Sequence, residues 1–332
     1  MKKALYVMIV MGSVFVGALQ VAAATYKIGM WPLIGWAEYR VAKVKGFWEK
    51  QGVTVEIVEY LSSLDYTRGY NQERFEFGPS PMPFIADDRN SGVSDSIYLG
   101  TFSIADRDKY FIIKKDLVNK SLKGQTIGTF SSDIANDFLL TTYLNTVNTH
   151  LADIRQVEMN PDEVEANFIH NRLHAVVALD RGNPFYEKAN GVIALSTRDF
   201  YEPHGLSIRQ HVLETIPPDD LKKILRGCVE AIQWIRDPAN WEEYKGILKQ
   251  YFLADQPDLS DDQIRALVQE GKFFDPQTLL EHNQQKLSDY FTQYRAFLAA
   301  ERSVKADVLN AFTYDNVIKN QALIEVLQAF GK

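Results

Sequence analysis

The sequence predicts an α/β protein of two lobes with a helical C-terminal tail, and three observations support this. Strand-like and helix-like segments alternate from residue 25 to about residue 196. The first segments form a strand-helix-strand unit, which implies a mostly parallel sheet. From Pro217 onward the segments carry the apolar stripe of amphipathic helices. With 332 residues, of which 46% are hydrophobic, the chain can bury two cores of ordinary size.

The N-terminal part predicts the first lobe. A strand at 26–30 leads into the loop "WPLIGW", and residues 38–52 then show helical spacing that ends at Gly52, a residue suited to a helix C-cap. Residues 53–60 alternate with period two, which predicts a strand with one buried face. A short helix at 66–72, a strand at 75–78, a loop at 79–84 and a strand at 96–104 complete the pattern.

A second α/β unit is predicted from residue 109 to about residue 196. Strands are expected at 110–116, 122–130, 154–160 and 173–180, with helices at 131–147 and 161–171. Ser131 or Ser132 is the candidate N-cap of the first helix, and Pro161 opens the second. The tail is predicted to form helices at 217–237, 238–252, 260–274 and 276–303, and Ser260 with Gln263 gives the third helix a capping box.

Residues 1–24 predict an export signal that is cleaved near Ala24. Lys2 and Lys3 precede a long uncharged run that closes on three alanines. An uncleaved membrane anchor is the alternative, because about 20 apolar residues span a bilayer. Loss of the two lysines takes the formal net charge from −7 to −9, and such a chain offers no basic surface to nucleic acid. Cys228, the single cysteine, is predicted to be buried in a helix.

The segment "IGMWPLIGWAEYRVAKVKGFWEKQGVTVEIVEY" resembles the start of periplasmic substrate-binding proteins of the sulfonate, nitrate and thiamine-precursor group. The segments "LKGQTIGTFSSDIANDFLL", "PDEVEANFIHNRLHAVVALD" and "GLSIRQHVLETIPPDDLKKILRGCVEAIQWIRDPANW" are similar to later parts of the family, in the same order. The resemblance implies a type 2 periplasmic binding protein fold with a ligand cleft between the lobes. Lobe 1 would comprise 25–106 and 204–332, lobe 2 would comprise 107–203, and the hinges would lie near 101–106 and 196–205.

Two departures from the family pattern leave the ligand open. His174 stands where the family usually has an acidic residue, and "ERFEFGPSP" replaces an acid-rich pattern. We interpret His174 as a histidine of the core or of the lobe edge and not as a ligand-binding residue.

In this fold the ligand lies at the carboxyl ends of strands and the amino ends of helices. Trp31 and Trp36 would supply flat apolar surface there, and Gly35 would let the backbone approach closely. The candidates in the first lobe are Trp31, Gly35, Trp36, Tyr39, Gly78, Ser80 and Met82, and those in the second lobe are Phe130, Ser131, Ser132, Asp133, Asp180 and Arg181. Core packing is the alternative for the four aromatic candidates. Trp36→Ala is expected to weaken ligand binding by roughly tenfold or more with the fold intact.

The charged candidates leave the sign of the ligand open. A helix start at Ser131 and Ser132 has free N–H groups that favour an anion. Asp133 would instead occupy that field, and together with Asp180 it would hold an amine. For Asp180 and Arg181 the alternative is an exposed ion pair that contributes little.

The implied function is that of an extracytoplasmic solute-binding protein. It would trap a pyrimidine, a sulfonate or an amine by hinge closure, deliver it to an ABC-type permease, and act as a monomer without cofactor, metal or nucleic acid. A ligand-sensing subunit that docks onto a membrane kinase or diguanylate cyclase is the alternative, because hinge closure serves both systems. An enzyme is not expected, since the sequence shows no nucleophile with a partner base, no metal-ligand spacing and no phosphate loop.

Overall fold

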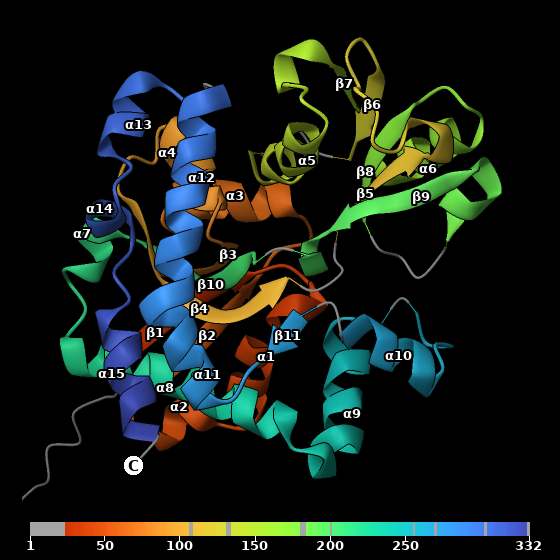
Figure 1. The fold of residues 1–332 in the computed structure, drawn as a ribbon. Helices are drawn as coiled ribbons and strands as arrows, with labels where there is room; N and C mark the ends of the chain where they lie inside the picture. Colours follow the sequence, from red (N-terminus) through yellow and green to blue (C-terminus); the bar gives the residue numbers. More distant parts are fainter. Residues whose placement is uncertain are drawn as a thin grey trace, which may run out of the picture.

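The computed structural model describes residues 24–105, 109–130, 134–179, 184–199, 201–254, 256–268, 271–301 and 304–330. The strands form two sheets, which lie in two lobes (Figure 1). The first contains β1 (Thr25–Met30), β2 (Thr54–Glu59), β3 (Phe77–Pro81), β4 (Ser96–Ala105), β10 (Pro203–Arg209) and β11 (Gly271–Phe273), in the order β11-β4-β10-β3-β1-β2. The second contains β5 (Lys109–Lys114), β6 (Thr126–Thr129), β7 (Arg155–Glu158), β8 (Ala175–Leu179) and β9 (Gly191–Ser196), in the order β7-β6-β8-β5-β9. The predicted two-lobe α/β fold is confirmed.

The first sheet gathers the ends of its parallel strands at one edge. β1 pairs in parallel with β2 along its whole length and with β3 at Phe77, while β10 lies antiparallel between β3 and β4. The carboxyl ends of β1, β2 and β3 therefore meet the amino end of β10, where the chain returns from the second lobe. We call this line of strand ends the carboxyl edge.

Helices cover both faces of the first sheet and form two cores. On β4, Ile97 and Leu99 belong to one core and Tyr98 to the other, as alternate residues of a strand do. The larger core receives α1 (Ala37–Val44), α2 (Phe47–Lys50), α8 (Pro218–Arg236), α9 (Trp241–Tyr251), α10 (Asp261–Val268), α11 (Pro276–Glu281) and α15 (Gln321–Phe330). The other core receives α4 (Phe84–Asn90), α12 (Leu287–Glu301) and α14 (Tyr314–Val317), and α3 (Ser63–Asn71), α7 (Gln210–Leu213) and α13 (Ala306–Ala311) complete the lobe.

The second sheet has one main helix on each face. Residues of α5 (Ile134–Thr146) form one core with β5, β6 and β8, and residues of α6 (Pro161–Ile169) form the other. Asn160 and Glu163 close a capping box at the start of α6, where Pro161 stands as predicted. All strands of this sheet come from residues 109–196, and the predicted lobe limits at 106/107 and 203/204 stay predictions.

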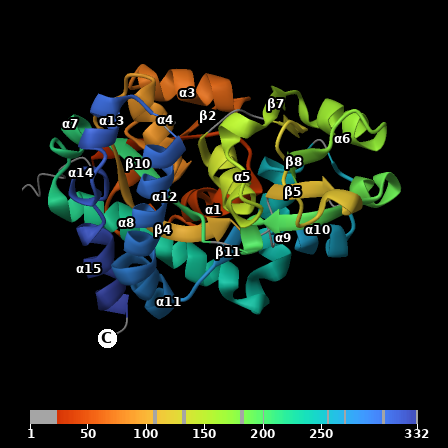
Figure 2. The same ribbon diagram turned by 45° about the horizontal axis from the view of Figure 1, so that its top comes forward.

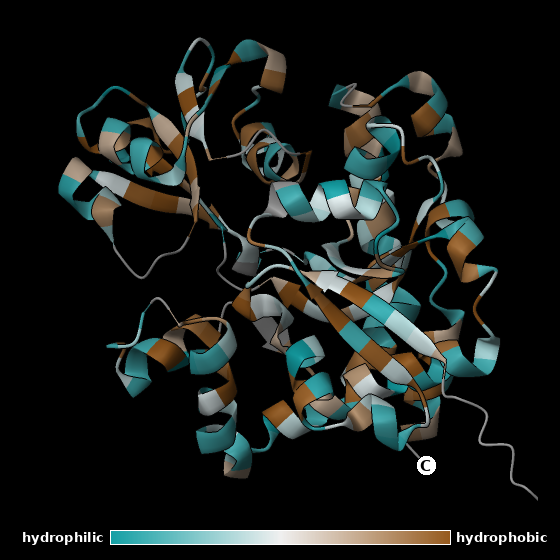
Figure 3. Cartoon of the chain, turned by 180° about the vertical axis from the view of Figure 1, so that it is seen from behind, coloured by the Kyte–Doolittle hydropathy of each residue, from teal (hydrophilic) through white to brown (hydrophobic). Residues whose placement is uncertain are grey.

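The two lobes touch where α5 approaches α4 and α12, and α5 lies beside α12 in both views (Figures 1 and 2). The contact is apolar: Ile134 and Phe138 of α5 share a core with Met82, Tyr290 and Tyr294 of the first lobe. Hydrophobic and hydrophilic residues alternate along the strands and helices of both lobes (Figure 3), as expected for elements with one buried face. Packing of apolar side chains thus fixes the side of the molecule on which the lobes are joined.

Three helix boundaries show how local backbone preferences act. The helix predicted at 38–52 is broken into α1 and α2 at Gly46, whose φ of +66° suits glycine. Gly52, with a φ of +81°, follows α2 as the expected C-cap, and Ser260 with Gln263 forms the expected capping box of α10. Among the residues that the structure describes, no helix is long and apolar enough to span a membrane. Residues 1–23 of the predicted export signal lie outside the described part.

Two predictions of secondary structure are wrong. The helix expected at 260–274 ends at Val268, because residues 271–273 form β11 and pair with the carboxyl-terminal part of β4. The loop expected at 79–84 begins too early, because β3 continues through Pro79 to Pro81. β3 pairs with β1 only at Phe77, so the strand has an open side on which a missing proline N–H breaks no ladder bond.

Candidate functional site

An aromatic cluster lies at the carboxyl edge, directly after β1. The ring of Trp31 stands edge-on to Trp36, with 4.0 Å between ring centroids and 81° between planes, and 4.6 Å from the ring of Tyr66 on α3. Trp36 is 1% exposed, whereas Trp31 covers it and is only partly buried. The indole N–H of Trp36 has no acceptor among the described residues. Trp31 therefore presents the accessible aromatic surface of the two.

Gly78 on β3 leaves room for the side chain of Tyr66. The Tyr66 hydroxyl donates a hydrogen bond to the Pro79 carbonyl oxygen at 3.0 Å. A Cβ at Gly78 would lie 2.1 Å from that hydroxyl, so the position must stay without a side chain. Ser80, also on β3, is buried and donates to the Pro81 carbonyl at 3.0 Å, and Met82 is buried in the apolar core shared with α5. Gly78 therefore adjoins the aromatic cluster, because it lies next to Tyr66.

The remaining first-lobe candidates lie differently. Tyr39 is buried in the larger core, where its ring meets that of Phe102 at 6.3 Å. Beside it, Glu38 is 1% exposed, and burial raises the pKa of its carboxyl to about 8, although a hydrogen bond with its own backbone opposes the change. Gly35 has open space where a Cβ would stand, with no atom of the described residues within 4 Å of that position.

In the second lobe the structure places one of the predicted candidates. Phe130 follows β6 and is partly buried between the cores of α5 and α6. Ser131, Ser132, Asp133, Asp180 and Arg181 lie outside the described residues, and their assignment stays a prediction. His174 is exposed, and its Nδ1 accepts a hydrogen bond from the Thr126 backbone at 3.2 Å, which places it at the edge of the lobe.

The start of α1 lies at the carboxyl edge, directly after a 3-10 turn (Ile34–Trp36) whose Ile34 carbonyl oxygen accepts from the Ala37 N–H. Trp36 precedes the helix and makes no side-chain capping bond to it. The first N–H groups of a helix have no partner within the helix and favour negatively charged or acceptor groups. Glu38 is the acidic residue of the first turn, and its raised pKa keeps it mostly protonated near pH 7. It therefore does not fill this field with a negative charge of its own.

A buried ion pair joins the two segments that run between the lobes. Lys109 Nζ lies 2.9 Å from one Glu202 oxygen and 3.2 Å from the other, and His204 Nε2 lies 3.3 Å from Glu202. Burial opposes ionisation of Glu202, but the charge of Lys109 and the contact with His204 outweigh it and lower the pKa of Glu202. Lys109 begins β5, just after the chain enters the second lobe, and Glu202 precedes β10, where the chain returns to the first lobe. The ion pair therefore connects the two crossings between the lobes.

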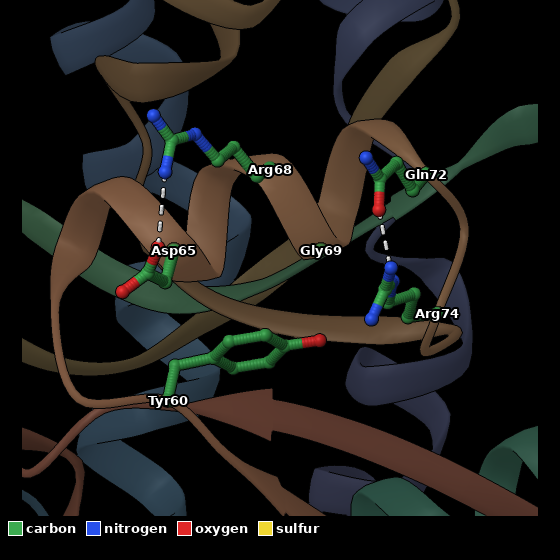
Figure 4. Close-up of a pocket in the computed structure, with 6 residues that line it drawn as sticks. All are labelled: Tyr60, Asp65, Arg68, Gly69, Gln72 and Arg74. Atoms are coloured by element: carbon green, nitrogen blue, oxygen red, sulfur yellow. Dashed lines mark hydrogen bonds and ion pairs between the residues drawn. The ribbon is translucent and has the colours of Figure 1, made fainter.

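Two hollows stand out on the described surface. One, of about 250 Å³, is lined by Tyr60, Asp65, Arg68, Gly69, Gln72 and Arg74. Figure 4 shows that its charged groups are paired with neighbours in the hollow: Arg68 with Asp65 at 3.2 Å, and Arg74 with Gln72 at 2.9 Å. We therefore do not assign it to a ligand.

The other hollow, of about 350 Å³, lies between α5, the segment that returns to the first lobe, and α12. We call it the interlobe pocket. Its walls include Phe138, Tyr201 and Tyr290. Nothing in the sequence marked Tyr290 beyond the apolar stripe of a helix, and Tyr66 was predicted only as the first residue of a short helix. Both were found only from the way distant segments pack together.

No group of three or more His, Cys, Asp or Glu residues suited to a metal ion occurs in the described part of the chain.

The sequence matches a family model described as NMT1/THI5 like over residues 35–235, which is more than half of the chain. The chain belongs to the NMT1/THI5-like family. The predicted resemblance is thereby confirmed. A comparison of this NMT1/THI5-like protein with curated protein sequences gives no match.

Solved structures give the same fold. The periplasmic nitrate-binding protein NrtA from Synechocystis PCC 6803 is 16% identical, with a TM-score of 0.62 over 92% of this NMT1/THI5-like chain and 89% of its own. The periplasmic aliphatic sulphonate binding protein SsuA from Escherichia coli is 15% identical, with a TM-score of 0.63 over 84% of this chain and 88% of its own. At such identities the likeness shows the fold, that of the periplasmic binding proteins.

Proposed function

We propose that this chain is an extracytoplasmic solute-binding protein, which captures a small organic molecule between its lobes, delivers it to an ABC-type permease and catalyses no reaction. Membership of the NMT1/THI5-like family and the fold shared with nitrate- and sulphonate-binding proteins support the proposal. The observation that carries it is the arrangement at the carboxyl edge: Trp31 is partly exposed beside the start of α1.

This arrangement favours a ligand with two parts. Trp31 offers a flat apolar surface to a ring or an alkyl group. The positive end of the α1 dipole favours a negatively charged or hydrogen-bond-accepting group, and the mostly protonated Glu38 does not repel it. We therefore favour a pyrimidine or a sulfonate over an amine at this edge. The lobes would close on the ligand about the two crossings that Lys109 and Glu202 hold together.

The first test is mass spectrometry of the exported protein under native conditions, compared with the same sample after denaturation. A discrete mass difference would identify the carried molecule, and its titration into Trp31→Ala should show binding weakened by roughly tenfold or more. Trp241→Phe, on α9, is the matched control and should bind as the parent does. If no molecule is carried and no pyrimidine or sulfonate binds, the proposal is wrong.

Delivery and export need separate experiments. Stimulation of the ATPase of a permease in proteoliposomes by the loaded protein would support transport, and its absence would favour the sensing alternative. N-terminal sequencing of the exported protein should find Thr25 or a near neighbour as the first residue, as cleavage near Ala24 requires.

A further inference from the structure

The interlobe pocket is a place where side chains of both lobes meet. Phe138 comes from α5 of the second lobe, Tyr290 from α12 of the first, and Tyr201 from the segment that returns to the first lobe. The Phe138 and Tyr290 rings meet edge to face at 5.7 Å, and the Tyr201 and Tyr290 rings do so at 5.8 Å. Its volume of about 350 Å³ falls in the range of pockets that hold small organic molecules.

One polar group in this pocket is left without a partner. Tyr290 is 4% exposed, and its hydroxyl has no hydrogen-bond partner among the described residues. Leaving a buried hydroxyl unpaired usually costs about 1–3 kcal/mol, so such groups often mark a place for a missing partner. The Tyr201 hydroxyl, by contrast, is used and donates to Thr101 Oγ1 at 3.3 Å.

The charges around the pocket are mostly negative. Asp199, Asp289 and Lys286 line it, which makes two carboxylates and one ammonium group. Asp289 and Lys286 lie one helical turn apart, yet neither takes part in an ion pair with a residue that the structure describes. Asp199 uses one oxygen to accept from the backbone N–H and the hydroxyl of Ser196.

We propose that the interlobe pocket is a second ligand site, separate from the carboxyl edge, and that it binds a small organic ammonium compound. Aromatic rings attract cations to their faces, and carboxylates at the rim supply the opposite charge. The hydroxyl of Tyr290 then gains an acceptor or donor partner on the ligand. An occupant contacts α5 and α12 at once, so its binding favours the arrangement of the lobes seen here.

The experiment uses calorimetric titration of the full exported chain with phenethylamine, and with 3-phenylpropionate as an anion that carries the same ring. Asp289→Asn removes one rim charge, and Tyr290→Phe removes the unpaired hydroxyl while it keeps the ring. Asp262→Asn, an exposed position on α10, is the matched control. Trp31→Ala tests whether the amine binds at the carboxyl edge instead.

Phenethylamine should bind at least tenfold more tightly than 3-phenylpropionate, and Asp289→Asn and Tyr290→Phe should each weaken it severalfold. Asp262→Asn and Trp31→Ala should leave its affinity unchanged. Tyr290→Phe should melt no lower than the parent protein, so it remains informative if Asp289→Asn folds poorly. The proposal is overturned if phenethylamine shows no binding at millimolar concentration, if the anion binds more tightly, or if Trp31→Ala abolishes amine binding while Asp289→Asn preserves it.

Discussion

Glu38 should make the stability of this protein fall as the pH rises. Its carboxyl is buried on α1, and the titratable groups that interact with it are neutral: the hydroxyls of Tyr39, Tyr98 and Tyr244 and the thiol of Cys228. Burial raises its pKa from 4.5 to about 8. The folded protein therefore keeps a proton that the unfolded chain releases at about pH 4.5.

The sign and size of the effect follow from this difference. Between pH 4.5 and about 8 the folded state binds more protons than the unfolded state, so the free energy of unfolding falls as the pH rises. The slope approaches about 1.4 kcal/mol per pH unit, and the whole window amounts to roughly 4–5 kcal/mol as an upper value. Below pH 4.5 the carboxyl is protonated in both states and the loss vanishes.

Glu38→Gln should remove this pH dependence. Urea unfolding at pH 5, 6, 7 and 8 can be followed by circular dichroism. We expect the free energy of unfolding of the variant, relative to that of the parent, to rise by several kcal/mol from pH 5 to pH 8. Glu56→Gln, at an exposed position on β2, is the control and should run parallel to the parent. Other groups that titrate in this window, such as Asp88, are common to all three proteins and cancel in the difference. Parallel profiles for Glu38→Gln and the parent would refute the reasoning.

Three further predictions concern the carboxyl edge and the crossings. Trp31→Ala should lower the affinity for the carried ligand by roughly tenfold or more in calorimetry. It should lower the melting temperature only modestly, because the Trp31 ring is partly exposed. Glu202→Gln leaves the Lys109 ammonium buried without its counter-charge and should lower the free energy of unfolding in urea by about 3–5 kcal/mol, with partial recovery in Lys109→Met/Glu202→Gln. Gly78→Ala places a methyl group 2.1 Å from the Tyr66 hydroxyl and should lower the melting temperature, whereas Tyr66→Phe/Gly78→Ala should recover part of the loss because the nearest clashing atom is gone.

The buried position of Trp36 changes one expectation drawn from the sequence. Since its side chain is 1% exposed, Trp36→Ala would leave a cavity and should destabilise the protein by about 3–5 kcal/mol as well as alter binding. The fold would then not be left intact, and a loss of affinity would have two causes. Thermal unfolding measured beside calorimetry separates them. Trp31→Ala is the cleaner test of an aromatic contact with ligand.

Strong local periodicity was enough to predict most of the fold. The unit from β1 to β2 and the helix α6, with Pro161 at its start, follow from patterns that repeat over a few residues. The elements that were predicted wrongly owe their structure to pairing with segments far away in the sequence. Residues 271–273 are a strand because they pair with Ser103, Ile104 and Ala105 of β4, and a helical pattern in the sequence carries no information about that pairing.

The candidate site was less accessible to sequence reasoning for the same reason. Trp31 and Trp36 could be chosen because they follow a strand directly. Which of the two is covered depends on Tyr66, which comes from α3. The interlobe pocket joins residues more than 150 positions apart, Phe138 and Tyr290, and no spacing rule relates them.

The strand order also determines when each part of the chain can fold. The second sheet is complete once residue 196 has emerged, because its strands are contiguous in sequence. The first sheet must wait for β10, which separates β3 from β4, and for β11 at the edge. A chain crossing a membrane from its N-terminus would thus present a finished second lobe while β3 and β4 still lack the strand between them. The first lobe, which carries the aromatic cluster at the carboxyl edge, is the last to complete its sheet, although its strand β1 is the first to emerge.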